Sequence, residues 1–213
     1  MVLVHGLWMR PVVMRPLARR LRRAGLCPAL YGYPSRRESI AAHAARLDHW
    51  LAQRFSPGEP LAFVGHSLGG VVLRALAARR AAWFEGARTV MLGTPNRGTM
   101  GGARLLDRGA GRWWLGVAGR ELARGTQAAL PVPPGAVGVI AGTRRRWCTR
   151  SLVTGANDGL VAVAETELEG AGLRTFRVGH TGLLLHRGVA EATAYFLVNG
   201  RFDGHGEPPR GLC

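Results

Sequence analysis

A serine between two glycines has the clearest capacity for chemistry in this chain. Ser67 is the centre of Gly65-His66-Ser67-Leu68-Gly69, which follows an apolar run at 61–65 and precedes a helical pattern. A strand, a sharp turn and a helix in this order present a serine hydroxyl at the carboxyl edge of a sheet. The glycines fit this turn because a Cβ there would meet the neighbouring strand or helix. Ser67 is therefore the predicted nucleophile.

A serine hydroxyl attacks a carbonyl carbon only when a base removes its proton, and a carboxylate must orient that base. His180 follows the last apolar run and is the predicted base. Asp158 follows the fifth apolar run and is the predicted acid, although its sequence Asn157-Asp158-Gly159 is also a strong turn signal. Each of the three side chains comes just after a predicted strand, where the ligands of parallel sheets gather.

Two main-chain amides are predicted to hold the negative charge that develops on an attacked carbonyl. The amide of Leu68 opens a helix and therefore has no acceptor within that helix. Gly6 lets the segment after the first strand turn closely, which places the amide of Leu7 beside it. We expect Leu7 and Leu68 to form this oxyanion hole, in which losing one donor commonly costs about 10²–10³ in kcat.

Other ionisable residues compete for these roles. His186 is the main alternative base, but we expect it to start or cap the final helix. Glu165 and Glu167 are alternative acids, and we expect both to face solvent. His5 and His66 flank the glycines that shape the site, where we expect them to pack rather than react. No pair of histidines has the spacing of metal ligands, so no metal site is predicted.

The elements that must position these residues alternate along the chain. Short runs rich in Val, Leu, Ile, Phe and Tyr predict six strands, at 2–5, 28–33, 61–65, 89–93, 137–142 and 174–178. Apolar stripes at helical spacing lie around 13–24, 40–51, 71–78 and 189–197. This alternation predicts an α/β fold with a parallel sheet and helices on both faces.

Two stretches between these elements are irregular. Residues 96–135 are rich in Gly and Arg, and we predict one helix in them, around 112–124. The pair Trp113-Trp114 in this stretch is compatible with an acyl pocket, with a lipid interface or with packing of the core. Residues 143–158 are predicted to form a long loop. We expect one domain over residues 1–202 and a disordered tail over 203–213, which is rich in Gly and Pro.

The formal net charge is +16, and all 29 basic residues are arginine. Such a charge attracts anionic lipid headgroups, nucleic acid or acidic substrates. The arginines are spread along the chain in short clusters, however, and no basic motif is interleaved with aromatic residues. We therefore expect most of them on solvated helix faces, and we expect no nucleic-acid partner.

Cysteines and apolar runs bear on the compartment. Cys27, Cys148 and Cys213 are odd in number and widely spaced, which favours reduced thiols over a disulfide framework or a zinc site. No run of 18 or more apolar residues predicts a transmembrane helix. The chain starts inside a predicted strand, with no signal peptide. We therefore expect a cytoplasmic protein, or a secreted one if the natural start precedes Met1.

Four motifs resemble those of small bacterial lipases and esterases of the α/β-hydrolase fold. They are Val-Leu-Val-His-Gly-Leu at 2–7, Gly-His-Ser-Leu-Gly-Gly at 65–70, Asn-Asp-Gly-Leu-Val at 157–161 and Val-Gly-His-Thr-Gly-Leu-Leu at 178–184. Leu-Gly-Thr-Pro-Asn-Arg-Gly-Thr at 92–99 also resembles a segment of lipase-like members. The resemblance covers residues 2–200 and implies the minimal six-stranded form, without a large lid. The long loop at 143–157 and the cationic surface are its two departures.

The resemblance implies a serine esterase or lipase that cleaves carboxylic esters through an acyl-enzyme, without a cofactor, by Ser67, Asp158 and His180. The expected substrate is a small-molecule or lipid ester, and weak association with an anionic membrane surface is a further expectation. Two alternatives stay open. One is the same chemistry on an amide or thioester, or transfer to an acceptor alcohol; the other is a non-catalytic relative that binds anionic surfaces. The sequence indicates neither the acyl-chain length nor the oligomeric state.

Overall fold

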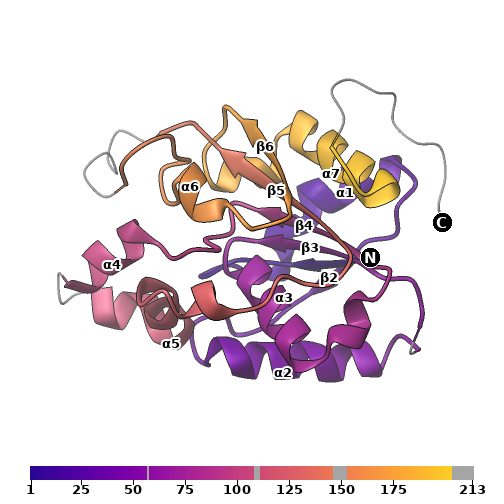
Figure 1. The fold of residues 1–213 in the computed structure, drawn as a ribbon, viewed down its shortest axis with the longest axis horizontal. Coiled ribbons are helices and arrows are strands. Elements are labelled where there is room, and N and C mark those ends of the chain that lie inside the picture. The colour runs from indigo at the N-terminus through magenta and orange to yellow at the C-terminus, as the bar shows by residue number, and fades with distance from the viewer. Residues whose placement is uncertain (57, 108–110, 146–152, 203–213) are drawn as a thin grey trace.

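A central parallel sheet with helices on both faces forms the body of the computed structural model in Figure 1. The structure describes residues 1–56, 58–107, 111–145 and 153–202. The predicted tail at 203–213 and part of the predicted loop at 143–158 lie outside these ranges.

The six strands of the sheet are ordered β2-β1-β3-β4-β5-β6, and every neighbouring pair is parallel. Their bounds are β1 Val2–Val4, β2 Ala29–Tyr31, β3 Ala62–His66, β4 Arg88–Leu92, β5 Ala136–Gly142 and β6 Gly172–Phe176. All six predicted strands are confirmed, each to within two residues at either end. Short, nearly continuous apolar runs identify such strands because both faces of the sheet are covered.

Two helices pack on each face of the sheet (Figure 1). α1 (Arg15–Arg23) and α7 (Arg187–Asn199) lie together on one face, and α2 (Ile40–Ala52) and α3 (Leu68–Arg79) lie on the other. Short 3₁₀ helices complete the connections, at Pro11–Met14, Ala81–Phe84, Thr126–Ala129 and Thr181–Leu184. The four helical stripes predicted from the sequence correspond to α1, α2, α3 and α7.

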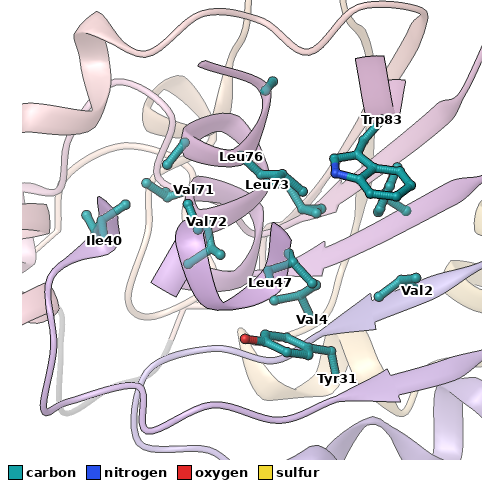
Figure 2. Packing of buried hydrophobic residues seen from close by; sticks show 14 of the residues in the cluster. Val2, Val4, Tyr31, Ile40, Leu47, Val71, Val72, Leu73, Leu76 and Trp83 are labelled. Atoms are coloured by element: carbon teal, nitrogen blue, oxygen red, sulfur yellow. The ribbon is translucent and has the colours of Figure 1, made fainter. Parts of the chain in front are cut away.

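Alternate residues of β1 supply the two apolar cores. Val2 and Val4 belong to the core beneath α2 and α3, whereas Leu3 belongs to the core beneath α1 and α7. This alternation follows from the two-residue period of a strand. Figure 2 shows the first core, in which side chains of β1, α2 and α3 face one another. Because α3 is buried over most of its length, the residue that precedes it has a rigid support.

The stretch at 96–135 contains two helices: the second confirms the helix predicted around 112–124, and the first was not predicted. α4 (Met100–Asp107) precedes α5 (Gly111–Ala123), and α5 is kinked at Gly116, where φ is 66°. Figure 1 shows the two helices side by side at one end of the sheet. α4 begins Met-Gly-Gly-Ala, and glycine disfavours helix, which explains why the sequence did not predict it. A four-residue helix, α6 (Val163–Thr166), was also not predicted.

Cys27 is disulfide-bonded, so the prediction of reduced thiols is wrong for this residue. Cys148 and Cys213 lie outside the described residues. Spacing along the chain did not reveal the bond because the fold decides which thiols meet. None of the helices in the described ranges is long and apolar enough to cross a membrane.

Candidate active site

Ser67 occupies the sharp turn between β3 and α3. Its backbone is strained, with φ 54° and ψ −122°, and non-glycine residues in such regions cost about 1–3 kcal/mol. The amide of Ser67 donates to the carbonyl of Leu92 at the end of β4, at 2.9 Å, and this bond fixes the turn to the sheet. The turn therefore has the geometry that the sequence predicted for a nucleophile.

The glycines on either side of Ser67 are required by close backbone contacts. A Cβ added to Gly69 would lie 2.2 Å from the carbonyl oxygen of Val4, and one added to Gly65 would lie 2.5 Å from the backbone of Gly70. Backbone atoms held in a sheet and a buried helix cannot move aside. The close approach of α3 to the sheet therefore depends on glycine at both positions.

The Asp158 carboxylate and the His180 imidazole form a buried hydrogen-bonded pair. The Nδ1 atom of His180 lies 2.6 Å from Oδ2 of Asp158, and the two residues are 6% and 1% exposed. The other carboxylate oxygen, Oδ1, accepts hydrogen bonds from the amides of Leu160 (3.0 Å) and Val161 (2.8 Å). A proton on Nδ1 leaves Nε2 as the acceptor, which is the form a general base needs.

Gly93, which follows β4, lies directly against this pair. A Cβ on Gly93 would be 3.1 Å from Oδ2 of Asp158 and 3.1 Å from Nδ1 of His180. Gly93 has a φ of 57°, which other residues rarely adopt. The backbone of β4 thus reaches both the acid–base pair and, through the bond from Leu92, the turn that carries Ser67.

The segment after β1 lies beside Ser67, as predicted for an oxyanion hole. A Cβ on Gly6 would be 3.0 Å from Cβ of Ser67. Tyr33 holds this segment in place, because its hydroxyl donates to the carbonyl of His5 at 2.7 Å and its ring stacks on the His5 imidazole. Burial raises the pKa of Tyr33 well above its usual value, so the phenol stays a donor.

Leu7 lines the same cavity as Ser67, and Leu68 is the first residue of α3. Among the described residues, the backbone hydrogen bonds include none donated by Leu7. The first amides of a helix have no intrahelical acceptor. The assignment of these two amides to an oxyanion hole stays a prediction.

His66 packs behind the acid–base pair. Its ring centroid lies 4.8 Å from that of His180, and its Nε2 is 3.2 Å from the carbonyl oxygen of His180. Burial, together with the neighbouring imidazole of His180, lowers the pKa of His66 to about 3. His66 is therefore neutral over the working range of a protein, and it contacts the site through packing and one backbone bond.

An apolar cavity of about 350 Å³ opens onto Ser67 and His180. Its walls include Leu105 of α4, Leu115 and Leu122 of α5, and Leu160 in the loop after Asp158. No hydrogen bond joins the Ser67 hydroxyl to the His180 imidazole, although both residues are described and line the same cavity. Catalytic hydrogen bonds are often long without substrate and tighten when it binds.

Buried polar side chains fasten the α4–α5 segment to the rest of the fold. Arg74 of α3 is 2% exposed and donates to the carbonyls of Asn96 (2.8 Å), Pro131 (3.2 Å) and Leu130. Gln127 donates from Nε2 to the carbonyls of Pro95 and Leu122. We call Arg74, Asn96 and Gln127 the polar clamp, since Arg74 ties both ends of this segment to α3 and Gln127 ties the two ends to each other.

Glu165 is buried, which corrects the expectation that it faces solvent. It is 8% exposed, and its carboxylate accepts hydrogen bonds from the amides of Ala162 (2.8 Å) and Met100, the first residue of α4. Glu165 therefore connects the loop of Asp158 to α4 and does not contact His180 in the described structure. Glu167 is exposed at its side chain and pairs with Arg97.

The remaining candidate residues lie outside the site. His186 is at the N-cap of α7 and packs on Phe176. No group of three or more His, Cys, Asp and Glu side chains able to hold a metal occurs in the ranges that the structure describes. Sequence reasoning missed Gly93, Tyr33 and the polar clamp, because each acts through a contact between distant parts of the chain.

Comparisons with known proteins agree with this architecture. A family model described as the alpha/beta hydrolase family matches residues 1–200. The mature lipase BlEst2 of Bacillus licheniformis superposes with a TM-score of 0.72 at 18% identity, over 93% of this chain and 90% of that one.

Two further solved structures are similar. The metagenomic carboxyl esterase MGS0156 has a TM-score of 0.66 at 20% identity, over 84% of this chain and 63% of that one. A lipase-esterase related protein of Clostridium acetobutylicum has a TM-score of 0.60 at 13% identity, over 92% of this chain and 93% of that one. The comparison with curated proteins finds no match. At these identities the structural likeness establishes the fold.

Proposed function

Since this chain belongs to the alpha/beta hydrolase family, we propose that it is a serine hydrolase that cleaves carboxylic esters through an acyl-enzyme. The observation that carries the proposal is the buried Asp158–His180 pair, whose imidazole lines the same apolar cavity as Ser67. The names of two similar structures, a lipase and a carboxyl esterase, support an ester as the substrate.

In the proposed mechanism, Nε2 of His180 takes the proton of the Ser67 hydroxyl as its oxygen attacks the ester carbonyl. The Asp158 carboxylate stabilises the imidazolium that forms and keeps Nδ1 protonated. The amides of Leu7 and Leu68 donate to the oxyanion of the tetrahedral intermediate. His180 then gives its proton to the departing alkoxide, which leaves as an alcohol, and Ser67 remains esterified.

Deacylation repeats these steps with water as the nucleophile. His180 removes a proton from water, the resulting hydroxide adds to the acyl carbonyl, and the same amides hold the second oxyanion. Collapse of this intermediate breaks the bond to Ser67 Oγ, which regains its proton from His180. The products are a carboxylic acid and free enzyme.

The test is the hydrolysis of p-nitrophenyl butyrate by Ser67→Ala, with Ser56→Ala as the matched control. Ser56 is exposed in the loop before β3, so its substitution should leave the rate unchanged. Losing the nucleophile is expected to lower kcat by about 10⁶. Wild-type rates in Ser67→Ala would refute the mechanism. A panel of matched ester, amide and thioester substrates decides the alternative, because a clear preference for amide or thioester would replace the ester assignment.

The apolar walls of the cavity favour an aliphatic acyl group. Each additional buried methylene contributes about 0.8 kcal/mol, or roughly fourfold in kcat/KM, until the cavity is full. A series of p-nitrophenyl esters should therefore show rising kcat/KM with chain length, followed by a plateau or fall. A series that declines from acetate onwards would show that the acyl group does not enter this cavity.

The compartment is also a proposal. The disulfide at Cys27 favours an oxidising compartment over the cytoplasm that the sequence predicted, because glutathione and thioredoxin keep cytosolic thiols reduced. Mass spectrometry of protein alkylated before and after reduction would measure the bond directly. Quantitative alkylation of Cys27 without reductant, in protein purified from its natural source, would show a free thiol and would favour the cytoplasm instead.

A further inference from the structure

Large apolar side chains are exposed around the mouth of the cavity. Trp8 is 49% exposed, Trp113 78%, Trp114 59%, Met100 39% and Leu160 43%. We call these five residues the apolar rim. Trp8 and Leu160 themselves line the cavity, and Trp114 directly precedes Leu115 of its wall. The rim therefore lies next to the cavity that contains Ser67.

The three tryptophans of the rim are held in place, although they are exposed. The indole Nε1 of Trp8 donates to the carbonyl of Trp114 at 2.9 Å, and the rings of Trp113 and Trp114 meet edge to face at 6.2 Å. Trp8 also has a φ of 58°, a strained conformation that bulky residues rarely adopt. Exposed indoles that are held in a fixed and strained arrangement indicate a binding surface.

The charge beside the rim is positive. Arg36 donates to the carbonyl of Trp113 at 3.1 Å, and Arg10 and Arg37 are exposed in the segments next to Trp8 and Arg36. Five of the eight arginines in residues 1–37 lie on α1, on the other face of the sheet, so Arg10, Arg36 and Arg37 are the ones that lie close to the rim. Glu38, the first acidic residue, is bound by two hydrogen bonds to Arg46. An occupant of this surface must therefore combine apolar material with negative charge.

We propose that the apolar rim docks the protein on an anionic phospholipid bilayer, with the cavity mouth facing the lipid. Tryptophan favours the boundary between headgroups and acyl chains, where its apolar ring and polar N–H are both satisfied. Each arginine near an anionic surface strengthens binding by about 1 kcal/mol, which is roughly fivefold. Docking in this orientation would deliver an ester from the bilayer to Ser67 without passage through water.

The test measures co-sedimentation with vesicles of phosphatidylcholine alone and of phosphatidylcholine mixed with phosphatidylglycerol. All proteins carry Ser67→Ala, so that hydrolysis does not alter the vesicles. We expect at least about tenfold stronger partition into the anionic vesicles, and a steep decrease with salt. The double variant Trp113→Ala/Trp114→Ala should lower the partition about 30-fold, because two indoles that would be half-buried in the bilayer are lost.

Leu173→Ala is the matched control, since Leu173 is 43% exposed on the edge strand β6 and does not belong to the rim. It should bind as the parent protein does, and thermal melting should show both variants folded. The proposal is overturned by equal partition into neutral and anionic vesicles, or by binding that the tryptophan substitutions leave unchanged. A dimer that these substitutions convert to a monomer would also overturn it, because a second copy would then cover the rim. Ester hydrolysis by the wild type is measured separately and survives each of these failures.

Discussion

The sheet edge that carries Ser67, Asp158 and His180 differs from the α4–α5 segment that walls the cavity. The sheet edge is fixed by backbone contacts: Ser67 is bonded to β4, and a side chain on Gly69 or Gly93 would clash with its surroundings. The α4–α5 segment is fixed by side chains, namely the polar clamp and Glu165. In the proposed mechanism the reactive groups thus belong to the sheet edge, and the wall of the substrate cavity belongs to a separately anchored segment.

This difference implies that the two regions can be perturbed independently. A substitution of a reactive group at the sheet edge should lower the turnover of every substrate by a similar factor, so that the order of acyl-chain preference does not change. A substitution in the polar clamp should alter the wall of the cavity and leave the reactive groups in place. The predictions below test this separation.

The largest effect is expected at the acid. Asp158→Asn removes the charge that stabilises imidazolium and reverses the polarity of the bond to Nδ1, so kcat should fall by about 10⁴. Glu165→Gln makes the same chemical change in the anchor of α4 and should cost less than about tenfold. Steady-state kinetics on p-nitrophenyl butyrate compares the two. An equal loss in both variants would remove the distinction between catalytic and anchoring carboxylates.

A smaller effect is expected from breaking the polar clamp. Arg74→Met leaves the carbonyls of Asn96, Leu130 and Pro131 without their donor, which should lower the free energy of unfolding by about 2–4 kcal/mol. Arg79→Met, on the same helix, removes a half-exposed ion pair with Asp48 and should cost at most about 1 kcal/mol. Hydrogen exchange should accelerate in α4 and α5 of the Arg74 variant, but not in β3 and α3. Uniform acceleration would show that the two regions unfold together.

The smallest effect is a pH dependence of stability at the sheet edge. Burial lowers the pKa of His66 to about 3 in the folded protein, whereas an unfolded histidine has the ordinary value of 6.5. Between these values the unfolded chain holds a proton that the folded protein lacks. The stability contributed by neutral His66 is therefore complete above pH 6.5 and is lost as the pH falls, by about 1.4 kcal/mol per unit.

His66→Gln should reduce this slope by about one proton between pH 6.5 and 5, in denaturant titrations at each pH. The slope will not vanish, because burial also lowers the pKa values of His5 and His43. His49→Gln is the control, since His49 is exposed on α2. An unchanged slope in His66→Gln would mean that this imidazole takes up its proton in the folded state.

The same contrast explains how much the sequence could predict. The six strands and the positions of Ser67, Asp158 and His180 follow from local patterns, because strand periodicity and the Gly-x-Ser-x-Gly turn are written in consecutive residues. The α4 helix could not be predicted, since Met100-Gly-Gly-Ala has poor helix propensity and is stabilised by Glu165, 65 positions later. Burial of Glu165 was missed for the same reason.

Exposure of the tryptophans could not be predicted either. Trp113 and Trp114 fit a core helix as well as a surface helix, and only the packing of α5 decided that Leu115 faces inward while they face solvent. The strain at Trp8 is equally invisible in a sequence. Long-range contacts thus account for most of what the patterns left open.

The account rests on Ser67 being the group that attacks the carbonyl carbon. The most direct test is labelling with a fluorophosphonate probe, followed by mass-spectrometric mapping of the modified peptide. We expect a single covalent adduct on Ser67, absent in Ser67→Ala and slowed by orders of magnitude in His180→Ala. An adduct on another serine, or undiminished labelling without the imidazole of His180, would contradict the account.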